Sequence, residues 1–300
     1  ATSHILSFST HAFLICLRDE YEQLRAQLLA RHPFVSLMVS STHEGFYLSQ
    51  EKYILGLLDH ASTDRRTAET PMKVKFTSLP LIPLDGPTRY RHIIGSLVNL
   101  GVTRPDISYS VHILNILSQF VSTPTQLYYS YRHLLRVLGY LRGTMSCRLF
   151  FPRSSSLQLQ AYCDATWASI PLIVDLLLFI TKKQTTVSRS STEAELRAMV
   201  LVMAEVTWLR WLFADFGVSV SIPTPLLTDS TCAIIIARDP VKHEVTKHIG
   251  VDAYYTRAQV HHDVVTLRCV PSELQLADFF KEAQTKHSFY LSKLSVFDPP

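Results

Sequence analysis

Cysteine motifs are the first feature that the sequence lacks. Its cysteines are scattered along the chain, and no two of them form a Cys-x-x-Cys pair. An odd number of dispersed thiols is typical of a protein kept in a reducing compartment, and it argues against a structural zinc cluster. We therefore expect an intracellular protein, cytoplasmic or nuclear. The cysteines are Cys16, Cys147, Cys163, Cys232 and Cys269.

The sequence also lacks the signals of secretion and of membrane insertion. Its first residues, ATSHILSFST, contain no basic segment ahead of an apolar core. The longest apolar run, residues 170–180, contains Asp175 and is too short to cross about 30 Å of hydrocarbon as a helix. We expect no membrane partner.

Glycine is scarce and the net charge is small. The chain has 300 residues, of which 9 are Gly and 47% are hydrophobic. That length and composition are enough for one large domain or two ordinary domains, each with its own core. A formal net charge of +4 fits a nucleic-acid partner without requiring one, because whole-chain charge sets only a weak bias.

Apolar side chains recur at helical spacing in the first half of the chain. The pattern predicts helices over residues 51–60 and 126–142. It also covers residues 89–120, with a break at Arg104-Pro105, because proline disfavours the helical conformation of the residue before it. Asp106, just after the break, is placed to cap the second helix of this pair. This part of the chain is predicted to be mainly helical.

The apolar period changes towards two from residue 148 onward. The stretches RLFF (148–151) and LQLQAYCD (157–164) predict strands. Further strands are expected near residues 223–229 and 264–270, separated by helical patterns. This order predicts a second domain, of mixed α/β class, with helices on the faces of its sheet. The helices are expected at residues 193–216, 231–238 and 247–260.

Four acids occupy comparable places in this second domain. Asp164 and Asp229 each end a predicted strand, Glu195 lies in the first turns of the long helix, and Asp278 lies in LQLADFFKE. Sites collect at strand ends and helix starts on one side of an α/β sheet. Gathered carboxylates repel one another unless cations neutralise them, and hard oxygen ligands favour Mg²⁺ or Mn²⁺. The alternative is that each acid is separately a cap or an exposed charge.

Several longer strings resemble a known family. The chain from about residue 45 to residue 300 is similar to the C-terminal part of a copia-type LTR-retrotransposon polyprotein, where the reverse transcriptase ends and a ribonuclease H domain follows. The strings that carry the resemblance are GFYLSQEKYI, ETPMKVK, YRHIIGSLVNLGVTRPDISYSV, LLRVLGYLRGT, AYCDATWA, KKQTTVSRSSTEAELRAM, WLRWLF, TKHIGVD and VPSELQLADFF.

The resemblance implies a fold and a division of the chain. The fold would be α/β, a ribonuclease H-like mixed five-stranded sheet with flanking helices, after a mainly helical remnant of a reverse-transcriptase thumb and connection. The implied parts are a poorly matching reverse-transcriptase segment at 1–44, the thumb and connection at 45–147, the ribonuclease H-like domain at 148–285 and a tail at 286–300.

The resemblance also implies an activity: endonucleolytic hydrolysis of the RNA strand of an RNA–DNA hybrid, with two Mg²⁺ or Mn²⁺ ions. Its four catalytic and metal-binding acids would be Asp164, Glu195, Asp229 and Asp278. Glu195 is preferred to Glu193 because the family pattern places this acid directly before the residue that precedes Arg-Ala. Other retroelement proteins, and a virus-like particle where the element is active, are the implied surroundings.

Two departures from the family pattern bear on activity. No Asp-Asp pair occurs, so the polymerase palm is missing and we expect no reverse-transcriptase activity from this chain. The segment between AYCDATWA and KKQ, within residues 168–183, is shorter than the family's by roughly a dozen residues, about two ordinary strands. A degenerate, non-catalytic remnant that binds nucleic acid weakly at most is therefore the alternative function. An integrase-type nuclease fits the TEAEL and QLADFF strings less well.

Some residues are lesser candidates. His248, in TKHIGVD, is a candidate auxiliary residue, although a polar residue at a helix start explains it equally well. Lys182, Lys183 and Arg189 precede the acid-bearing helix, where they either contact phosphates or belong to a solvated loop. A zinc site is disfavoured, because the histidine spacings match no zinc template. These histidines are His243, His248, His261 and His262.

Overall fold

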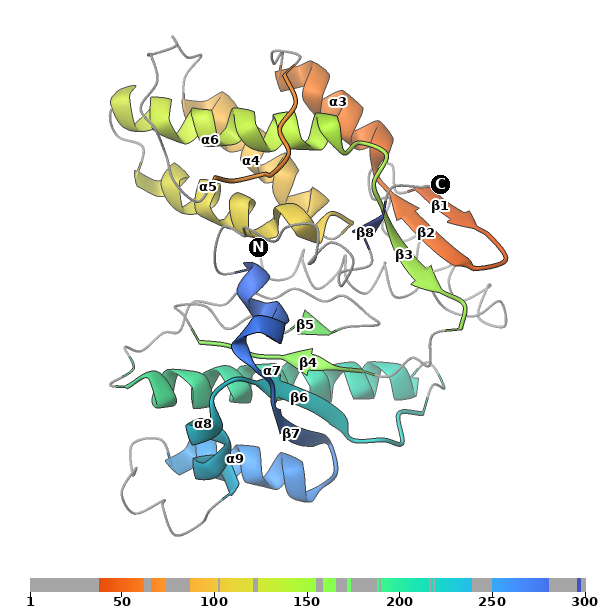
Figure 1. Cartoon of the computed structure of the whole chain (residues 1–300), viewed down its shortest axis with the longest axis vertical. Helices are drawn as coiled ribbons and strands as arrows, with labels where there is room; N and C mark the ends of the chain where they lie inside the picture. Colours follow the sequence, from red (N-terminus) through yellow and green to blue (C-terminus); the bar gives the residue numbers. More distant parts are fainter. Residues whose placement is uncertain are drawn as a thin grey trace. The chain divides into compact units, whose positions relative to one another are not determined.

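The structure is a computed structural model in which the chain forms two compact units (Figure 1). The first unit comprises Ala1–Ser154 and Glu282–Pro300, and the second Ser155–Lys281. The described residues are 38–61, 66–73, 87–101, 103–120, 124–154, 159–165, 172–173, 188, 190–215, 217, 219–238, 250–280 and 296–297.

The first unit contains an antiparallel sheet, in the order β1-β2-β3-β8 among its described strands. Gly45 begins β2 because the β2–β3 pair needs close backbone approach there: a Cβ at this position would collide with the carbonyl oxygen of Phe151. The strands are β1 (Met38–Ser41), β2 (Gly45–Ser49), β3 (Arg148–Pro152) and β8 (Val296–Phe297).

Helices form the rest of the described part of the first unit. They bury one apolar stripe each in a common core, which includes Leu97, Leu114, Leu134 and Leu138. The predicted helices at 51–60 and 126–142 are confirmed, with ends within two residues of those expected. The helices are α3 (Glu51–Ala61), α4 (Pro87–Leu100), the 3₁₀ turn η2 (Pro105–Ile107), α5 (Ser108–Phe120) and α6 (Pro124–Gly143).

A buried ion pair joins these helices. Arg104 and Asp106 are both almost inaccessible to solvent, and Arg104 Nη2 lies 2.6 Å from Asp106 Oδ2. The Tyr140 hydroxyl donates to the same oxygen at 2.6 Å, and Arg104 donates to the carbonyl and the hydroxyl of Thr144. Asp106 therefore connects η2 to α6, a long-range role that its position before a helix does not predict.

The second unit is a mixed α/β domain. Its described strands follow the order β5-β4-β6-β7, in which β4, β6 and β7 run parallel and β5 is antiparallel to β4. The strands are β4 (Ala161–Tyr162), β5 (Leu172–Ile173), β6 (Thr224–Thr228) and β7 (Val265–Cys269). The α/β class is confirmed, and the described residues contain four strands of this sheet where five are expected.

Three α-helices in the described part of this unit pack with its sheet. A 25-residue helix, α7, buries Leu196, Met199, Val202, Met203 and Val206 against side chains of the strands and of the other two helices. Two short 3₁₀ turns complete the described part. These elements are α7 (Ser191–Asp215), α8 (Thr231–Arg238), α9 (Gly250–His261), η5 (Ser272–Leu274) and η6 (Leu276–Phe280).

The segment RLFF lies in a different sheet from the one expected. The sequence places 148–151 at the start of the second domain, whereas the structure pairs this strand, β3, with β2 of the first unit. A period of two identifies a strand but not its partner. Here the partner is chosen by apolar contact: Leu48 is paired with Leu149, and both side chains are buried.

Some expectations concern residues outside the described part of the chain. These are the segment at 1–37, most of the shortened stretch at 168–183 and most of the tail at 286–300. None of the helices that the structure does describe has the length and apolar character needed to cross a membrane.

Candidate metal centre

Two strand ends bring the first pair of acids together. Strands β4 and β6 are parallel, with Tyr162 paired to Leu227, and Asp164 and Asp229 each follow this pair by two residues. Because parallel strands end at the same edge of a sheet, both carboxylates lie at that edge. Asp164 is buried, with 4% of its surface exposed, and Asp229 is half-buried.

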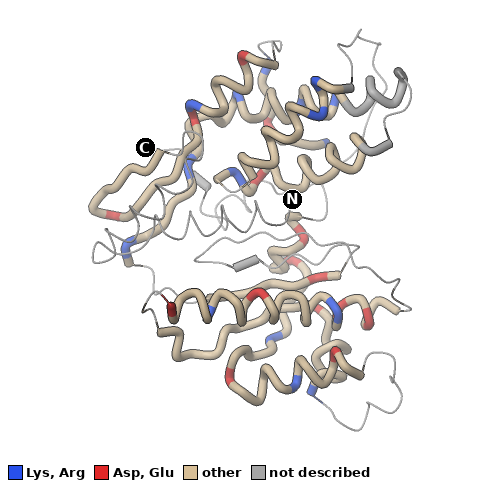
Figure 2. The backbone as a smooth tube through the Cα atoms, turned by 180° about the vertical axis from the view of Figure 1, so that it is seen from behind, with Lys and Arg blue, Asp and Glu red and all other residues tan. Residues whose placement is uncertain are grey.

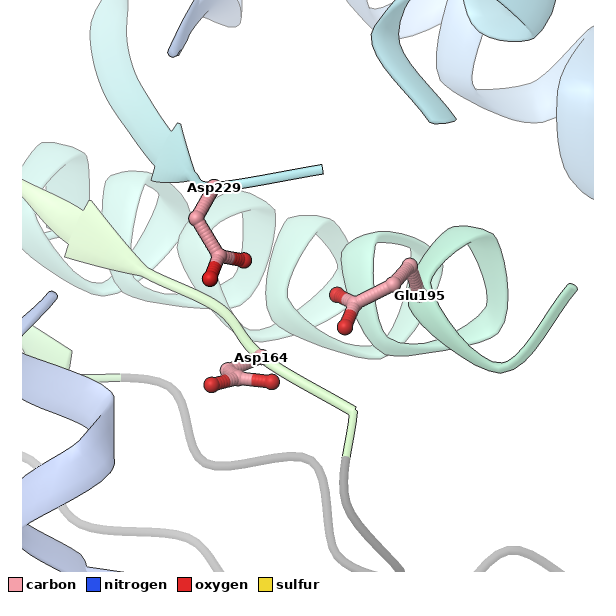
Figure 3. A group of neighbouring side chains, drawn as sticks. All are labelled: Asp164, Glu195 and Asp229. Carbon is pink, nitrogen blue, oxygen red and sulfur yellow. The ribbon is translucent and has the colours of Figure 1, made fainter. Parts of the chain in front are cut away.

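Helix α7 supplies the third acid. Glu195 lies in the second turn of α7, and Figure 3 shows its carboxylate converging with those of Asp164 and Asp229. One ligand atom from each of the three residues lies within 4.8 Å of the others. The backbone N–H of Ala165 donates to Glu195 Oε1 at 3.1 Å, which links the helix to the chain just after β4.

The surroundings of Glu195 perturb its carboxyl group. Burial raises the pKa of Glu195 to about 8, and the nearby charge of Asp164 acts in the same direction. The second oxygen, Glu195 Oε2, is buried and has no hydrogen-bond partner. An orphaned carboxylate oxygen in a group with two further acids fits a hard divalent cation, because Mg²⁺ and Mn²⁺ prefer such oxygen ligands.

Glu193, two residues earlier on α7, has a different environment. Its carboxylate is buried and lies 2.6 Å from Arg197 Nη2, and Arg197 in turn lies 3.8 Å from Asp252 of α9. Two residues correspond to about 200° around a helix, so Glu193 and Glu195 face opposite ways. The structure thus places Glu195, and not Glu193, with the other two acids.

Asp278 lies on the 3₁₀ turn η6. Among the described residues, the acidic group contains Asp164, Glu195 and Asp229 but not Asp278. The segment that carries Asp278 nevertheless contacts the same edge of the sheet. The Ser272 hydroxyl donates to Asp229 Oδ2 at 3.0 Å, and Gln275 Nε2 donates to the carbonyl of Cys163 at 3.0 Å.

Sequence reasoning missed Ser272 and Gln275. The one signal for Gln275 is a polar amide in the run LQLADFF, whose other residues apart from Asp278 are apolar, so that burial would leave the amide in need of partners. The lesser candidates Lys182, Lys183, Arg189 and His248, together with His243, lie outside the described residues. His261 and His262 pack edge-to-face at the end of α9, and neither belongs to a metal-ligand group in the described part of the chain.

The pKa of Glu195 predicts how the metal-free chain responds to pH. The folded carboxyl keeps its proton up to about pH 8, whereas the unfolded one loses it near pH 4.3. Its stabilising contribution is complete below the unfolded pKa and is lost as the pH rises through 8. We expect Glu195→Gln to raise the free energy of unfolding by roughly 2 kcal/mol at pH 9, allowing for solvent screening, and to change it little at pH 5.

Urea unfolding in EDTA at the two pH values measures this difference. The matched control is Glu193→Gln on the same helix, which breaks the ion pair with Arg197 and should destabilise the chain at pH 9. Equal effects of Glu195→Gln at pH 5 and pH 9 would contradict the expectation.

Comparison with curated proteins identifies relatives over most of the chain. It is 35% identical over 288 residues, 90% of this chain, to the retrovirus-related Pol polyprotein from transposon RE1 of Arabidopsis thaliana. The identity and coverage are the same for the corresponding polyprotein from transposon RE2. An uncharacterized mitochondrial protein of Arabidopsis thaliana is 36% identical over 191 residues, 59% of this chain and 78% of that protein.

These similarities define a family. The chain belongs to the retrovirus-related Pol polyproteins of copia-type retrotransposons, and it spans 19% of the length of the RE1 and RE2 polyproteins. The resemblance carried by the sequence motifs is confirmed at this level. No family model matches the chain, and no solved structure matches it.

Proposed function

We propose that the second unit is a ribonuclease H-type nuclease that cleaves the RNA strand of an RNA–DNA hybrid internally. The observation that carries this proposal is the group of three carboxylates, Asp164, Glu195 and Asp229, built from the ends of two parallel strands and the start of one helix. The mixed sheet β5-β4-β6-β7 of the described residues supports the ribonuclease H-like fold that the motifs imply, for which five strands are expected.

The acids would act as ligands for two Mg²⁺ or Mn²⁺ ions. Asp164 and Asp229 offer oxygens at the sheet edge, Glu195 offers its orphaned Oε2, and Asp278 would approach from η6 as the fourth acid. Bound ions of this kind supply an activated water and stabilise the leaving oxygen in phosphodiester hydrolysis. Selection of RNA would rest on contacts to 2′-hydroxyls in the minor groove of the hybrid.

The first unit offers support for a nucleic-acid partner. Helices α4 and α6 contain arginines and no acidic residue (Figure 2). Such helices suit contacts with phosphates, which dominate the affinity of nucleic-acid binding. We assign this unit to the thumb and connection of the reverse transcriptase, with other proteins of the element as partners inside the cell. The arginines are Arg89, Arg91, Arg132, Arg136 and Arg142.

A second candidate function is that of a degenerate remnant that binds nucleic acid weakly and has no activity. The segment within residues 168–183 favours this candidate, because it is shorter than the family's by roughly a dozen residues, about two ordinary strands. Catalytic groups that are misplaced by about an ångström can lower the rate of the catalysed reaction greatly. The two candidates share the same acids and differ in whether those acids are held closely enough to act.

Cleavage of labelled nucleic acids by the purified chain, residues 1–300, separates the candidates. We expect internal cuts in the RNA strand of an RNA–DNA hybrid with Mg²⁺, and none with EDTA. A DNA duplex and an RNA duplex of the same sequence should stay intact. A chain that unfolds cooperatively, and is therefore folded, but leaves the hybrid intact would be the degenerate remnant.

A further inference from the structure

The side chain of Gln275 bridges two parts of the proposed metal centre. Gln275 is completely buried, and both the nitrogen and the oxygen of its side-chain amide form hydrogen bonds. Nε2 donates to the carbonyl of Cys163 at 3.0 Å, and Oε1 accepts from the backbone N–H of Ala277 at 3.3 Å. Cys163 directly precedes Asp164, and Ala277 directly precedes Asp278. One amide therefore joins the backbone that carries the first acid to the backbone that carries the fourth.

The two backbone positions that Gln275 joins are otherwise far apart in the chain. Gln275 and Cys163 are separated by 112 residues. The N–H of Cys163 donates to the carbonyl of Leu227 at 2.9 Å and so continues the ladder between β4 and β6. The carbonyl of Cys163 is bound by Gln275. That ladder fixes the end of β4. Because the amide of Gln275 is bonded to this strand end, it also fixes the position of η6 relative to β4.

The same segment is held to the second strand end as well. The exposed Ser272 donates to Asp229 Oδ2, while Leu276, Phe279 and Phe280 are buried on either side of Asp278. The buried apolar side chains hold η6 in the core of the second unit. Apolar packing is not directional, so it does not set the position of the η6 backbone along β4. A buried hydrogen bond does set this position, because leaving the buried amide unsatisfied would cost more free energy than the hydrogen bond itself contributes.

We propose that Gln275 is a positioning residue of the metal centre, which holds Asp278 beside the end of β4 so that it acts with Asp164 on the bound ions. This inference rests on the proposed function and adds to it a residue that binds no ion itself. Groups that orient metal ligands change metal affinity by about 10- to 100-fold when they are removed.

Titration with Mn²⁺, followed by the electron paramagnetic resonance signal of the free ion, tests the inference without any cleavage assay. Gln275→Met keeps the length of the side chain and removes both hydrogen bonds. We expect it to weaken Mn²⁺ binding about tenfold. The matched control is Thr256→Val, which removes the hydroxyl of another fully buried polar residue in the same unit; this hydroxyl lies on α9 and donates to the backbone carbonyl of Asp252. Its Mn²⁺ affinity should stay within about twofold of the parent.

A double variant distinguishes positioning from general loosening. If Gln275 acts through Asp278, then Gln275→Met combined with Asp278→Asn should bind Mn²⁺ no more weakly than Asp278→Asn alone. Additive losses would overturn the inference, and so would an unchanged Mn²⁺ affinity of Gln275→Met. If Gln275→Met does not unfold cooperatively and is therefore not folded, Gln275→Asn replaces it in both experiments. Asparagine keeps the amide, but its side chain is too short to form the same two hydrogen bonds.

The parent chain separates this inference from the proposed function. A parent that binds Mn²⁺ but leaves the hybrid intact would contradict the nuclease, while the titrations of the Gln275 variants would still decide the positioning role. A parent that binds no Mn²⁺ would overturn the metal centre and the inference together.

Discussion

Asp164→Asn should reduce hydrolysis of the RNA strand in an RNA–DNA hybrid by about 10³-fold. Asp164 is the most buried of the three grouped acids and lies next to both Glu195 and Asp229. Asparagine keeps the shape of the side chain and removes the charge that a divalent cation needs. Initial rates with Mg²⁺, measured on a labelled hybrid at saturating enzyme, give the ratio.

The same substitution should leave the fold intact or stabilise it. Without metal, the charge of Asp164 disfavours ionisation of the neighbouring Glu195 carboxyl, and removing that charge relieves this unfavourable interaction. The thermal unfolding temperature of Asp164→Asn in EDTA should therefore equal or exceed that of the parent. Asp215→Asn makes the same charge change at the exposed far end of α7, about 30 Å along the helix from Glu195, and should keep parental activity. Full activity of Asp164→Asn would rule out its role as a ligand.

The second large effect is expected in the first unit. Asp106→Asn should lower the free energy of unfolding by about 3–5 kcal/mol, because it leaves the buried guanidinium of Arg104 without its counter-charge. The new amide group would also face two donors, Arg104 and the Tyr140 hydroxyl. Burial by itself lowers the pKa of Arg104, but the negative charge and hydrogen bonds of Asp106 outweigh it and raise that pKa, so Arg104 stays charged in the parent.

Tyr140→Phe provides a graded control for this effect. It removes one hydrogen bond to Asp106 and leaves the ion pair, so it should cost only about 1–2 kcal/mol. Urea unfolding should be followed by two probes, because the two units can unfold in separate transitions. A loss below about 1 kcal/mol for Asp106→Asn would show that Arg104 finds another partner or solvent.

Elements with strong local patterns could be predicted from the sequence. The helix at 51–60 and the helix at 126–142 are confirmed as α3 and α6, because an apolar stripe at helical spacing needs no knowledge of its partner. The break before Asp106 is likewise local, since proline disfavours helix in the preceding residue. The destination of β3 was not predictable, because its pairing with β2 joins segments distant from each other in the chain.

The candidate site was likewise predictable from the sequence only in part. The motifs identified Asp164, Glu195 and Asp229 as a set, and the structure groups these three. The resemblance preferred Glu195 to Glu193, while the structure gives a physical reason: the two side chains face opposite sides of α7, and Arg197 holds Glu193. Asp278 was predicted as a fourth ligand and stays a prediction, because it lies on η6 outside the grouped set.

The sequence by itself determined the family, the class of the second unit and the kinds of side chain available to a metal, because motifs and periodicity are properties of neighbouring residues. The tertiary structure decided which carboxylates lie close together and that Glu195 keeps its proton near neutral pH without metal. It also decided that Gln275 joins the backbone just before Asp164 to the backbone just before Asp278. These features depend on the register of β4 and β6 and on burial. Both are set by contacts between residues distant in the chain, which no local pattern encodes.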